Sequence, residues 1–378
     1  MTAAIDELID AGTPTPEAIE RFIAENDFPI QEGTASTFCY YGPADRVSLK
    51  HWIYGLGTSL PFERVGDSDL WYLTLELPAG SRVEYKLRVT SGPSHPLIRD
   101  PLNPARARDP FGANSVCYGL GYEPPEWIAE DPESRPGALE RLLVPSRSFG
   151  DKRPVEIYLP ARFRRSRTYP LLVVHDGHDY LRYAAFKEIL DNLIERLEIA
   201  PLVVALTRSP RRLDDYAASS THAEFLRDEL VPLLEDRLPL EASPEGRGLM
   251  GASFGAVAAL STAWRYPGFF GRLLLQSGSF AFTDIGPNRR GPAFEPIVDF
   301  MNSFRKAPAR VSDRLYVSCG MYESLIYENR SLIPLLQSAG MEVRYTEARD
   351  GHNWENWRDR LREGLSYLFP GPLWMVYE

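Results

Sequence analysis

The chain has 378 residues, of which 44% are hydrophobic and 25% are charged, and its formal net charge is −10. This composition is typical of a globular protein with room for two domains and a large core. The acidic balance argues against a broad nucleic-acid or anionic-membrane surface. Its three cysteines are far apart, and no Cys/His pattern has metal-ligand spacing. We therefore expect no metal or organic cofactor.

The first residues contain no basic segment followed by a long apolar run, so they do not resemble a signal peptide. No apolar run approaches membrane-spanning length. These two features favour a cytoplasmic protein without a membrane partner.

Residues 1–33 are predicted to form an N-terminal helical segment. Thr15 can cap a helix over residues 15–26, and Pro16 then occupies the first helical position, where proline is tolerated. The apolar side chains of this helix share one face, which indicates a packing role without chemistry.

Residues 34–120 are predicted to form an antiparallel β-sandwich of Ig-like size, because short alternating runs are separated by turn signals. The expected strands are 36–41, 47–54, 70–77 and 83–89. Its large aromatic side chains either fill the core, which we favour, or form a ligand-stacking platform; they are Trp52, Trp71 and Tyr85. Residues 121–138 are predicted to be a linker.

Residues 139–378 alternate strands with helices, which predicts a doubly wound, mainly parallel α/β sheet of the α/β-hydrolase type. The predicted strands are 139–144, 155–159, 169–175, 202–206, 248–250, 272–276, 315–318 and 343–347. Helices are expected at about 181–197, 221–237, 256–265, 329–338 and 354–368.

The sequence Gly251-Ala252-Ser253-Phe254-Gly255 follows the fifth of these strands and opens an alanine-rich helix. In α/β-hydrolases a G-x-S-x-G turn in this context presents the nucleophilic serine. The same five-residue pattern also occurs in ordinary strand–helix turns. The assignment of Ser253 as a nucleophile therefore depends on whether the chain also supplies a base and an acid.

A catalytic serine needs a base, and the base needs an acid that orients it. Among six histidines, only His352 follows the last predicted strand, where the base of an α/β-hydrolase belongs. We expect Glu323 to be the acid, because it follows the strand 315–318. Asp284 is the better rival and Asp350 the other.

The oxyanion hole requires two N–H donors. We expect them from Phe254, which follows the serine, and from the loop around Gly177 and His178. His178 could instead bind substrate through its side chain, whereas Asp176 is better suited to bracing the loop.

Basic residues gather near the same strand ends. Arg208, Arg211 and Arg212 follow the strand 202–206, and Arg289 and Arg290 lie on residues 281–310, a candidate lid. These arginines form either a cationic pocket for an anionic substrate or an ordinary solvated loop. The substrate-binding candidates are Arg212, Asp176, Arg208 and Trp354.

Together these motifs resemble the enterochelin esterase family and the wider esterase D-like hydrolases, which include feruloyl esterases. The residues that carry the resemblance are His175-Asp176-Gly177, Arg212-Leu213-Asp214-Asp215-Tyr216, Gly251–Gly255, Gly320-Met321-Tyr322-Glu323 and Gly351-His352-Asn353-Trp354-Glu355-Asn356-Trp357. The chain departs from the family at Asn353, where an aspartate is usual. The N-terminal β-region is similar to the Ig-like domain of longer members.

This resemblance implies a cytoplasmic serine esterase that cleaves catecholate siderophore trilactones and so releases iron. Three alternatives stay open: a feruloyl or acetyl esterase acting on carbohydrate, an acyltransferase of the same fold, and a non-catalytic binding protein. The expected partner is a small ester, anionic if the arginines bind it; no nucleic acid is expected, and a homodimer is an open option.

Overall fold

The structure is a computed structural model that describes residues 4–10, 12–282 and 290–372. The chain forms two compact units. The first comprises residues 1–124 together with two short segments from far along the chain, 321–324 and 348–353. The second comprises residues 125–320, 325–347 and 354–378.

The first unit is built on two antiparallel sheets. The four-stranded sheet has the order β1-β2-β6-β5 and contains β1 (Ile30–Glu32), β2 (Ala35–Tyr41), β5 (Glu63–Arg64) and β6 (Leu70–Glu76). The six-stranded sheet has the order β4-β3-β7-β10-β9, with β8 paired to β7; its strands are β3 (Arg46–His51), β4 (Ser59–Pro61), β7 (Arg82–Thr90), β8 (Leu97–Ile98), β9 (Arg106–Asp109) and β10 (Gly112–Tyr118). Buried side chains from both sheets share one core, so this unit is a β-sandwich, as predicted.

Two helices, α1 (Ala4–Asp10) and α2 (Pro16–Glu25), complete the sandwich unit. The Thr15 hydroxyl accepts a hydrogen bond from the Ala18 backbone N–H at 3.3 Å, and Pro16 begins the helix, as predicted. Ile19 and Phe22 bury the apolar face of α2 in a small core that they share with sandwich residues such as Cys39 and Leu70. The helix therefore has a packing role.

The sandwich aromatic side chains divide between core and surface. Trp71 and Tyr85 are 6% and 0% exposed, so the prediction of core positions is right for these two. Trp52 follows β3 and is 50% exposed, so the same prediction is wrong for it. The error arises because alternation holds only within a strand, and the structure ends β3 at His51.

The second unit contains an eight-stranded sheet of order β11-β12-β14-β13-β15-β16-β17-β18. Its strands are β11 (Ala138–Ser146), β12 (Asp151–Leu159), β13 (Leu171–Val174), β14 (Val203–Thr207), β15 (Arg247–Ala252), β16 (Arg272–Gln276), β17 (Arg314–Gly320) and β18 (Glu342–Ala348). The strands from β14 to β17 run parallel to one another, whereas β11 and β12 are antiparallel. This is the predicted α/β-hydrolase architecture.

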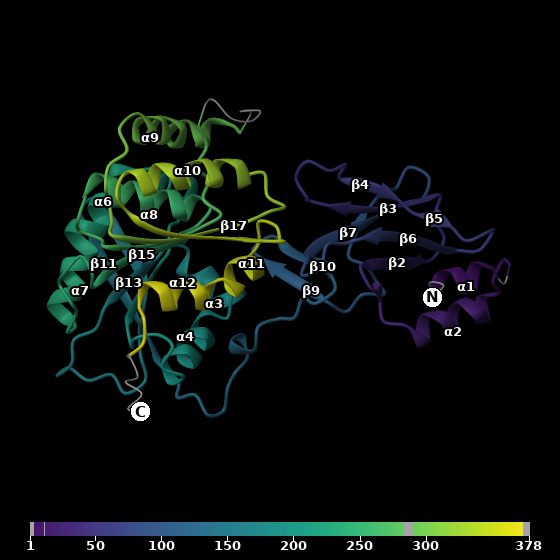
Figure 1. Cartoon of the computed structure of the whole chain (residues 1–378), viewed down its shortest axis with the longest axis horizontal. Coiled ribbons are helices and arrows are strands. Elements are labelled where there is room, and N and C mark those ends of the chain that lie inside the picture. The colour runs from purple at the N-terminus through teal and green to yellow at the C-terminus, as the bar shows by residue number, and fades with distance from the viewer. Residues whose placement is uncertain (1–3, 11, 283–289, 373–378) are drawn as a thin grey trace. The chain divides into compact units, whose positions relative to one another are not determined.

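Helices cover both faces of this sheet, because its central strands are apolar on both sides (Figure 1). In β13, Leu171 and Val173 belong to one core and Leu172 and Val174 to the other. One face packs against α6 (Ser220–Glu224), α7 (Val231–Arg237), α8 (Phe254–Arg265), α9 (Glu295–Lys306) and α10 (Ile326–Ser338). The other packs against α3 (Gly177–Tyr183), α4 (Phe186–Glu195), α11 (Trp354–Asp359) and α12 (Leu361–Leu368).

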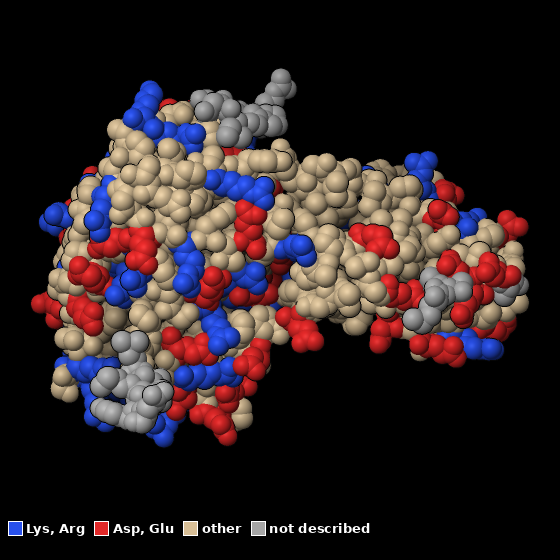
Figure 2. All heavy atoms as spheres, in the orientation of Figure 1, with Lys and Arg blue, Asp and Glu red and all other residues tan. Residues whose placement is uncertain are grey.

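Several predicted helices are interrupted in the structure. The helix expected over 221–237 contains a π-helical segment, η2 (Phe225–Leu230), between α6 and α7. The helix expected at about 181–197 is divided between the end of α3 and α4. Short helical elements also lie at α5 (Arg212–Asp215), η1 (Glu126–Ile128) and η3 (Pro292–Phe294). On the face of the α/β unit shown in Figure 2, Lys/Arg and Asp/Glu side chains are interspersed.

Candidate active site

The G-x-S-x-G sequence forms a sharp turn between β15 and α8. Ser253 has φ 58° and ψ −120°, a backbone conformation that residues with a side chain rarely adopt. A Cβ atom on Gly251 would lie 2.4 Å from the Gly255 carbonyl carbon, so a side chain at residue 251 would not fit. The turn is therefore the strained strand–helix elbow that the sequence predicts.

Two backbone hydrogen bonds hold Ser253 in this conformation. Its N–H donates to the Gln276 carbonyl at 2.9 Å, and its carbonyl accepts from the Ser279 N–H at 3.2 Å. The Ser253 Oγ also lies 3.2 Å from the Ser279 Oγ. Ser279 is not among the predicted site residues, although it follows β16, the strand next to the elbow.

Phe254 is the first residue of α8, so its N–H is among the N-terminal helix donors that lack an intrahelical acceptor. This position suits the predicted oxyanion donor. Gly177 begins α3, and a Cβ atom there would lie 2.5 Å from Cα and Cβ of Leu206 in β14. Residue 177 must therefore be glycine because of a neighbouring strand. That the 177–178 loop donates to the oxyanion stays a prediction.

An ion pair links the loop after β13 to the elbow. Arg212 Nε lies 2.7 Å from Asp176 Oδ2, and Arg212 Nη2 lies 3.4 Å from the carbonyl oxygen of Ala252, next to Ser253. Burial raises the pKa of Asp176, and the Arg212 guanidinium opposes this shift. The pair therefore brings two predicted substrate-binding residues together at the elbow, with Asp176 bracing its loop.

Two histidines near the elbow are packed in the core. His175 Nδ1 lies 2.8 Å from the Met250 carbonyl oxygen, and its Nε2 lies 3.0 Å from His222 Nε2. Because a carbonyl accepts only, Nδ1 of His175 carries the proton and its Nε2 accepts from His222. Burial lowers the pKa of His175 to about 4 and that of His222 well below its usual value. Both imidazoles are neutral at pH 7.

This pair predicts acid sensitivity. An unfolded chain protonates both histidines below a pH of about 6.5, whereas the folded chain keeps His175 neutral until near pH 4, and burial likewise keeps His222 neutral well below its usual pKa. The free energy of unfolding should therefore decrease as the pH falls from 6.5 to 4, by up to about 1.4 kcal/mol per pH unit for each histidine. Denaturant unfolding measured across this range tests the slope.

The variant His222→Phe should be less stable at neutral pH, and its stability should depend less on pH. His95→Gln is a matched control, because His95 is exposed on the sandwich. An unchanged slope in His222→Phe would show that the buried pair does not cause the acid sensitivity.

The predicted base and acid are in contact. His352 Nδ1 lies 2.6 Å from Glu323 Oε2. The Glu323 side chain is 0% exposed, whereas that of His352 is 38% exposed. A buried carboxylate on Nδ1 orients the ring and stabilises its protonated form, which is the role of the acid in a catalytic triad.

The rival acids differ in position. Asp350 binds Arg82 at 3.2 Å and accepts from the Gly351 N–H and the Asn353 side-chain amide at 2.7 and 2.8 Å. Asp284 lies outside the described residues. Geometry therefore favours Glu323 over Asp350 as the partner of His352.

The remaining predicted site residues lie in different environments. Arg208 and His178 are exposed, whereas Trp354 is 8% exposed and packs edge-on against Tyr180 with ring centroids 5.1 Å apart. Arg290 is paired with the buried Glu328 on α10. Arg289 lies outside the described residues, as does part of the candidate lid.

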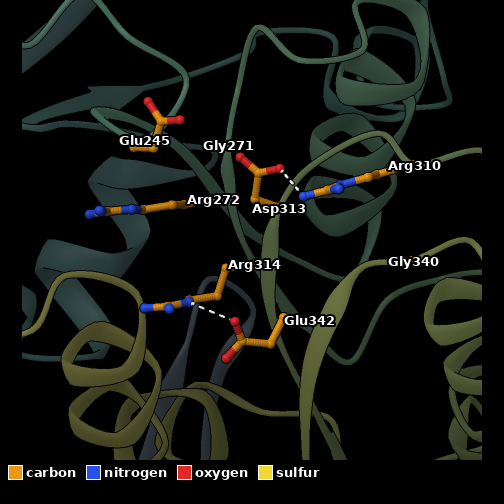
Figure 3. A pocket seen from close by; sticks show the side chains of 8 residues that line it. All are labelled: Glu245, Gly271, Arg272, Arg310, Asp313, Arg314, Gly340 and Glu342. Atoms are coloured by element: carbon orange, nitrogen blue, oxygen red, sulfur yellow. Dashed lines mark hydrogen bonds and ion pairs between the residues drawn. The ribbon is translucent and has the colours of Figure 1, made fainter.

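A pocket of about 260 Å³ lies at the amino ends of the strands, opposite to the carboxyl ends where Ser253 lies (Figure 3). Arg272, Arg314 and Glu342 begin β16, β17 and β18, whereas Ser253 follows the end of β15. The other lining residues are Glu245, Gly271, Arg310, Asp313 and Gly340. Three arginines face three carboxylates, with Arg310 paired to Asp313 and Arg314 to Glu342. The lining carries no nucleophile for ester chemistry.

Within the described part of the chain, no group of three or more His, Cys, Asp or Glu side chains is arranged to hold a metal ion. Over the same residues, no helix is both long enough and apolar enough to span a lipid bilayer.

A mainly parallel sheet with a strained serine turn after its fifth strand defines the α/β-hydrolase class. Residues 146–368 match the family described as "Putative esterase". The chain therefore belongs to this esterase family.

The chain is also similar to two curated proteins and one solved structure. It is 30% identical over 239 residues to "Uncharacterized protein YjcH" of Bacillus subtilis, covering 61% of this chain and 98% of that protein. It is 23% identical to the iron(III) enterobactin esterase of Escherichia coli K12, over 81% of each chain. The solved structure of the enterochelin esterase from Shigella flexneri superposes with a TM-score of 0.71 at 21% identity, covering 89% of this chain and 94% of that one.

Proposed function

We propose that the protein is a serine esterase that hydrolyses carboxylic esters through an acyl-enzyme. The observation that carries this proposal is the 2.6 Å contact between His352 Nδ1 and the buried Glu323 carboxylate. These residues follow Ser253 in the order Ser…Glu…His that α/β-hydrolases use. The strained backbone at Ser253 supports its assignment as the nucleophile.

The reaction has two stages. The Ser253 Oγ attacks the ester carbonyl carbon while His352 Nε2 takes the hydroxyl proton, since Nδ1 faces Glu323. The N–H groups of Phe254 and the 177–178 loop stabilise the negative oxygen. The carbon–oxygen bond breaks, and the leaving alkoxide takes the proton from His352. Water then attacks the acyl-enzyme by the same route and releases the acid.

The substrate class that we propose is an anionic lactone ester, a catecholate siderophore trilactone, hydrolysed in the cytoplasm to release iron. Two features support it: enterobactin esterases match most of the chain, and Arg208, Arg211 and Arg212 follow β14. Arg212 also touches the carbonyl of Ala252, so a guanidinium lies beside the proposed nucleophile. Iron enters as part of the substrate.

The carbohydrate-esterase alternative is less well supported. Two of the three sandwich aromatics that could stack on sugar, Trp71 and Tyr85, are buried. A half-exposed Trp52 is a small platform for a glycan.

An ester panel tests the proposal. The panel contains p-nitrophenyl esters, ethyl ferulate, a catecholate trilactone and its ferric complex, and the products are identified by mass. We expect the trilactone to gain one water for each ester bond cleaved, and a fluorophosphonate probe to form an adduct on Ser253. Absence of both turnover and adduct would favour a binding protein, and preference for ethyl ferulate would contradict the siderophore assignment.

A further inference from the structure

Arg82 is buried on the face of β7 that points away from the sandwich core. In this strand Val83, Tyr85 and Leu87 face the core, so the alternation turns Arg82 and Arg88 to the opposite face. Arg88 is exposed there, as expected, yet Arg82 is only 2% exposed. A buried guanidinium is costly unless it is paired, so its partners indicate what it does.

Those partners flank His352. Arg82 Nη1 donates to Asp350 Oδ1 at 3.2 Å and to Asn353 Oδ1 at 3.1 Å. Asn353 in turn donates to Asp350 at 2.8 Å, which closes a small network around the loop. Glu84, two residues along β7, accepts from both terminal nitrogens of Arg82 at 3.2 Å.

Backbone hydrogen bonds attach the same loop to the loop of the acid. The Arg82 N–H donates to the Arg349 carbonyl at 2.9 Å, and the Tyr322 N–H donates to the Asp350 carbonyl at 3.1 Å. The Tyr322 hydroxyl lies 2.6 Å from the Ser81 hydroxyl. Residues 321–324 and 348–353 thus form one hydrogen-bonded cluster with the start of β7, within the sandwich unit.

The charge state of the network depends on Arg82. Burial raises the pKa of Asp350 to about 6, and Glu84 adds to this shift. The Arg82 guanidinium, the Asn353 side chain and the Gly351 N–H oppose it, so Asp350 is ionised at pH 8. Arg82 is the cation among these four groups, so its removal would leave the Asp350 carboxylate with neutral and negative neighbours among them.

We propose that Arg82 is a positioning residue of the hydrolytic reaction: by binding Asp350 and Asn353 on either side of His352, it fixes the imidazole against Glu323. This inference rests on the proposed function. A general base must be held within a fraction of an ångström of its working position, and a displacement of about 1 Å can cost about 100-fold in rate. The N-terminal sandwich therefore supplies part of the apparatus that orients the base.

The test uses the full chain with Arg82→Met, and with Arg88→Met as the matched control on the same strand. We expect Arg82→Met to lower kcat by about 10- to 100-fold with KM changed less than about threefold. The loss of kcat should be greater at pH 6 than at pH 8. Without Arg82 the pKa of Asp350 rises further, so this carboxylate takes up a proton as the pH falls. Arg88→Met should match the wild type.

A readout independent of turnover is the downfield proton resonance of the His352 Nδ1–H···Oε2 hydrogen bond to Glu323. It should broaden or shift in Arg82→Met and persist in Arg88→Met. It also separates this inference from the esterase assignment, since the resonance reports the pair even if no ester is cleaved. An unchanged resonance together with a kcat within twofold of wild type would overturn the proposal.

A double variant that removes both buried charges distinguishes positioning of His352 from simple stabilisation of the fold. Arg82→Met combined with Asp350→Asn removes both buried charges, so its unfolding midpoint should recover relative to Arg82→Met while its kcat stays low. Recovery of kcat along with stability would show a structural role only and overturn the inference. If Arg82→Met does not fold, Arg82→Lys keeps the charge but not the forked contacts, and it should give an intermediate loss of kcat. Wild-type kcat in Arg82→Lys would count against the proposal.

Discussion

Replacing Ser253 by alanine is expected to lower kcat for ester hydrolysis by about 10⁵-fold, because it removes the hydroxyl that we propose forms the acyl-enzyme. KM should change little. The residual rate would come from the oxyanion donors and from substrate binding, which remain. Steady-state kinetics on a p-nitrophenyl ester measures the loss.

The fold should survive this change. Alanine meets the same backbone strain as serine at φ 58°, so the unfolding midpoint of Ser253→Ala should stay close to that of the wild type. Ser253→Gly is the informative control, since glycine relieves the strain and should raise the free energy of unfolding by about 1 kcal/mol while remaining inactive. Ester turnover retained by Ser253→Ala would exclude Ser253 as the nucleophile.

Substitution of the acid should have the second-largest effect. Glu323→Gln is expected to lower kcat by about 10³-fold, because its side-chain NH2 can donate to Nδ1 of His352 and leave the proton on Nε2. That tautomer cannot accept the serine proton. Glu323→Ala should be no worse, since water can reach a His352 side chain that is 38% exposed.

Glu328→Gln provides the matched control for Glu323→Gln. Glu328 is also buried, at 2% exposed, but its partner is Arg290. Its amide variant should keep kcat near the wild-type value. If Glu323→Gln also keeps it within twofold, the buried carboxylate has no part in the reaction.

Local patterns were sufficient to predict most of the fold. The apolar runs predicted the strands of the α/β unit and their succession along the chain, and the glycines around Ser253 predicted the elbow. Chain order also singled out His352 and Glu323, because strand ends in a parallel sheet gather side chains at one edge. The strands and the elbow depend mainly on neighbouring residues, which is why local patterns predict them. The catalytic roles of His352 and Glu323 stay predictions.

Other features depend on partners far apart in the chain, and local patterns do not show them. Arg82 and Asp350 are paired across 268 positions. Alternation along β7 predicts an exposed arginine at residue 82. Leu206, on the next strand, excludes a side chain at Gly177, and local patterns do not show this packing either. The buried pair of His175 and His222 likewise has no sequence signature.

The grouping of residues 348–353 with the sandwich limits how modular this chain can be. A fragment beginning at Pro125 would keep Ser253, Glu323 and His352, yet it would lose Arg82. In that fragment Asp350 would lack the guanidinium that it binds in the full chain. Chimeras that exchange the N-terminal region between relatives should therefore carry the arginine and the aspartate together. The two positions should be inherited as a unit, although one lies in each half of the gene.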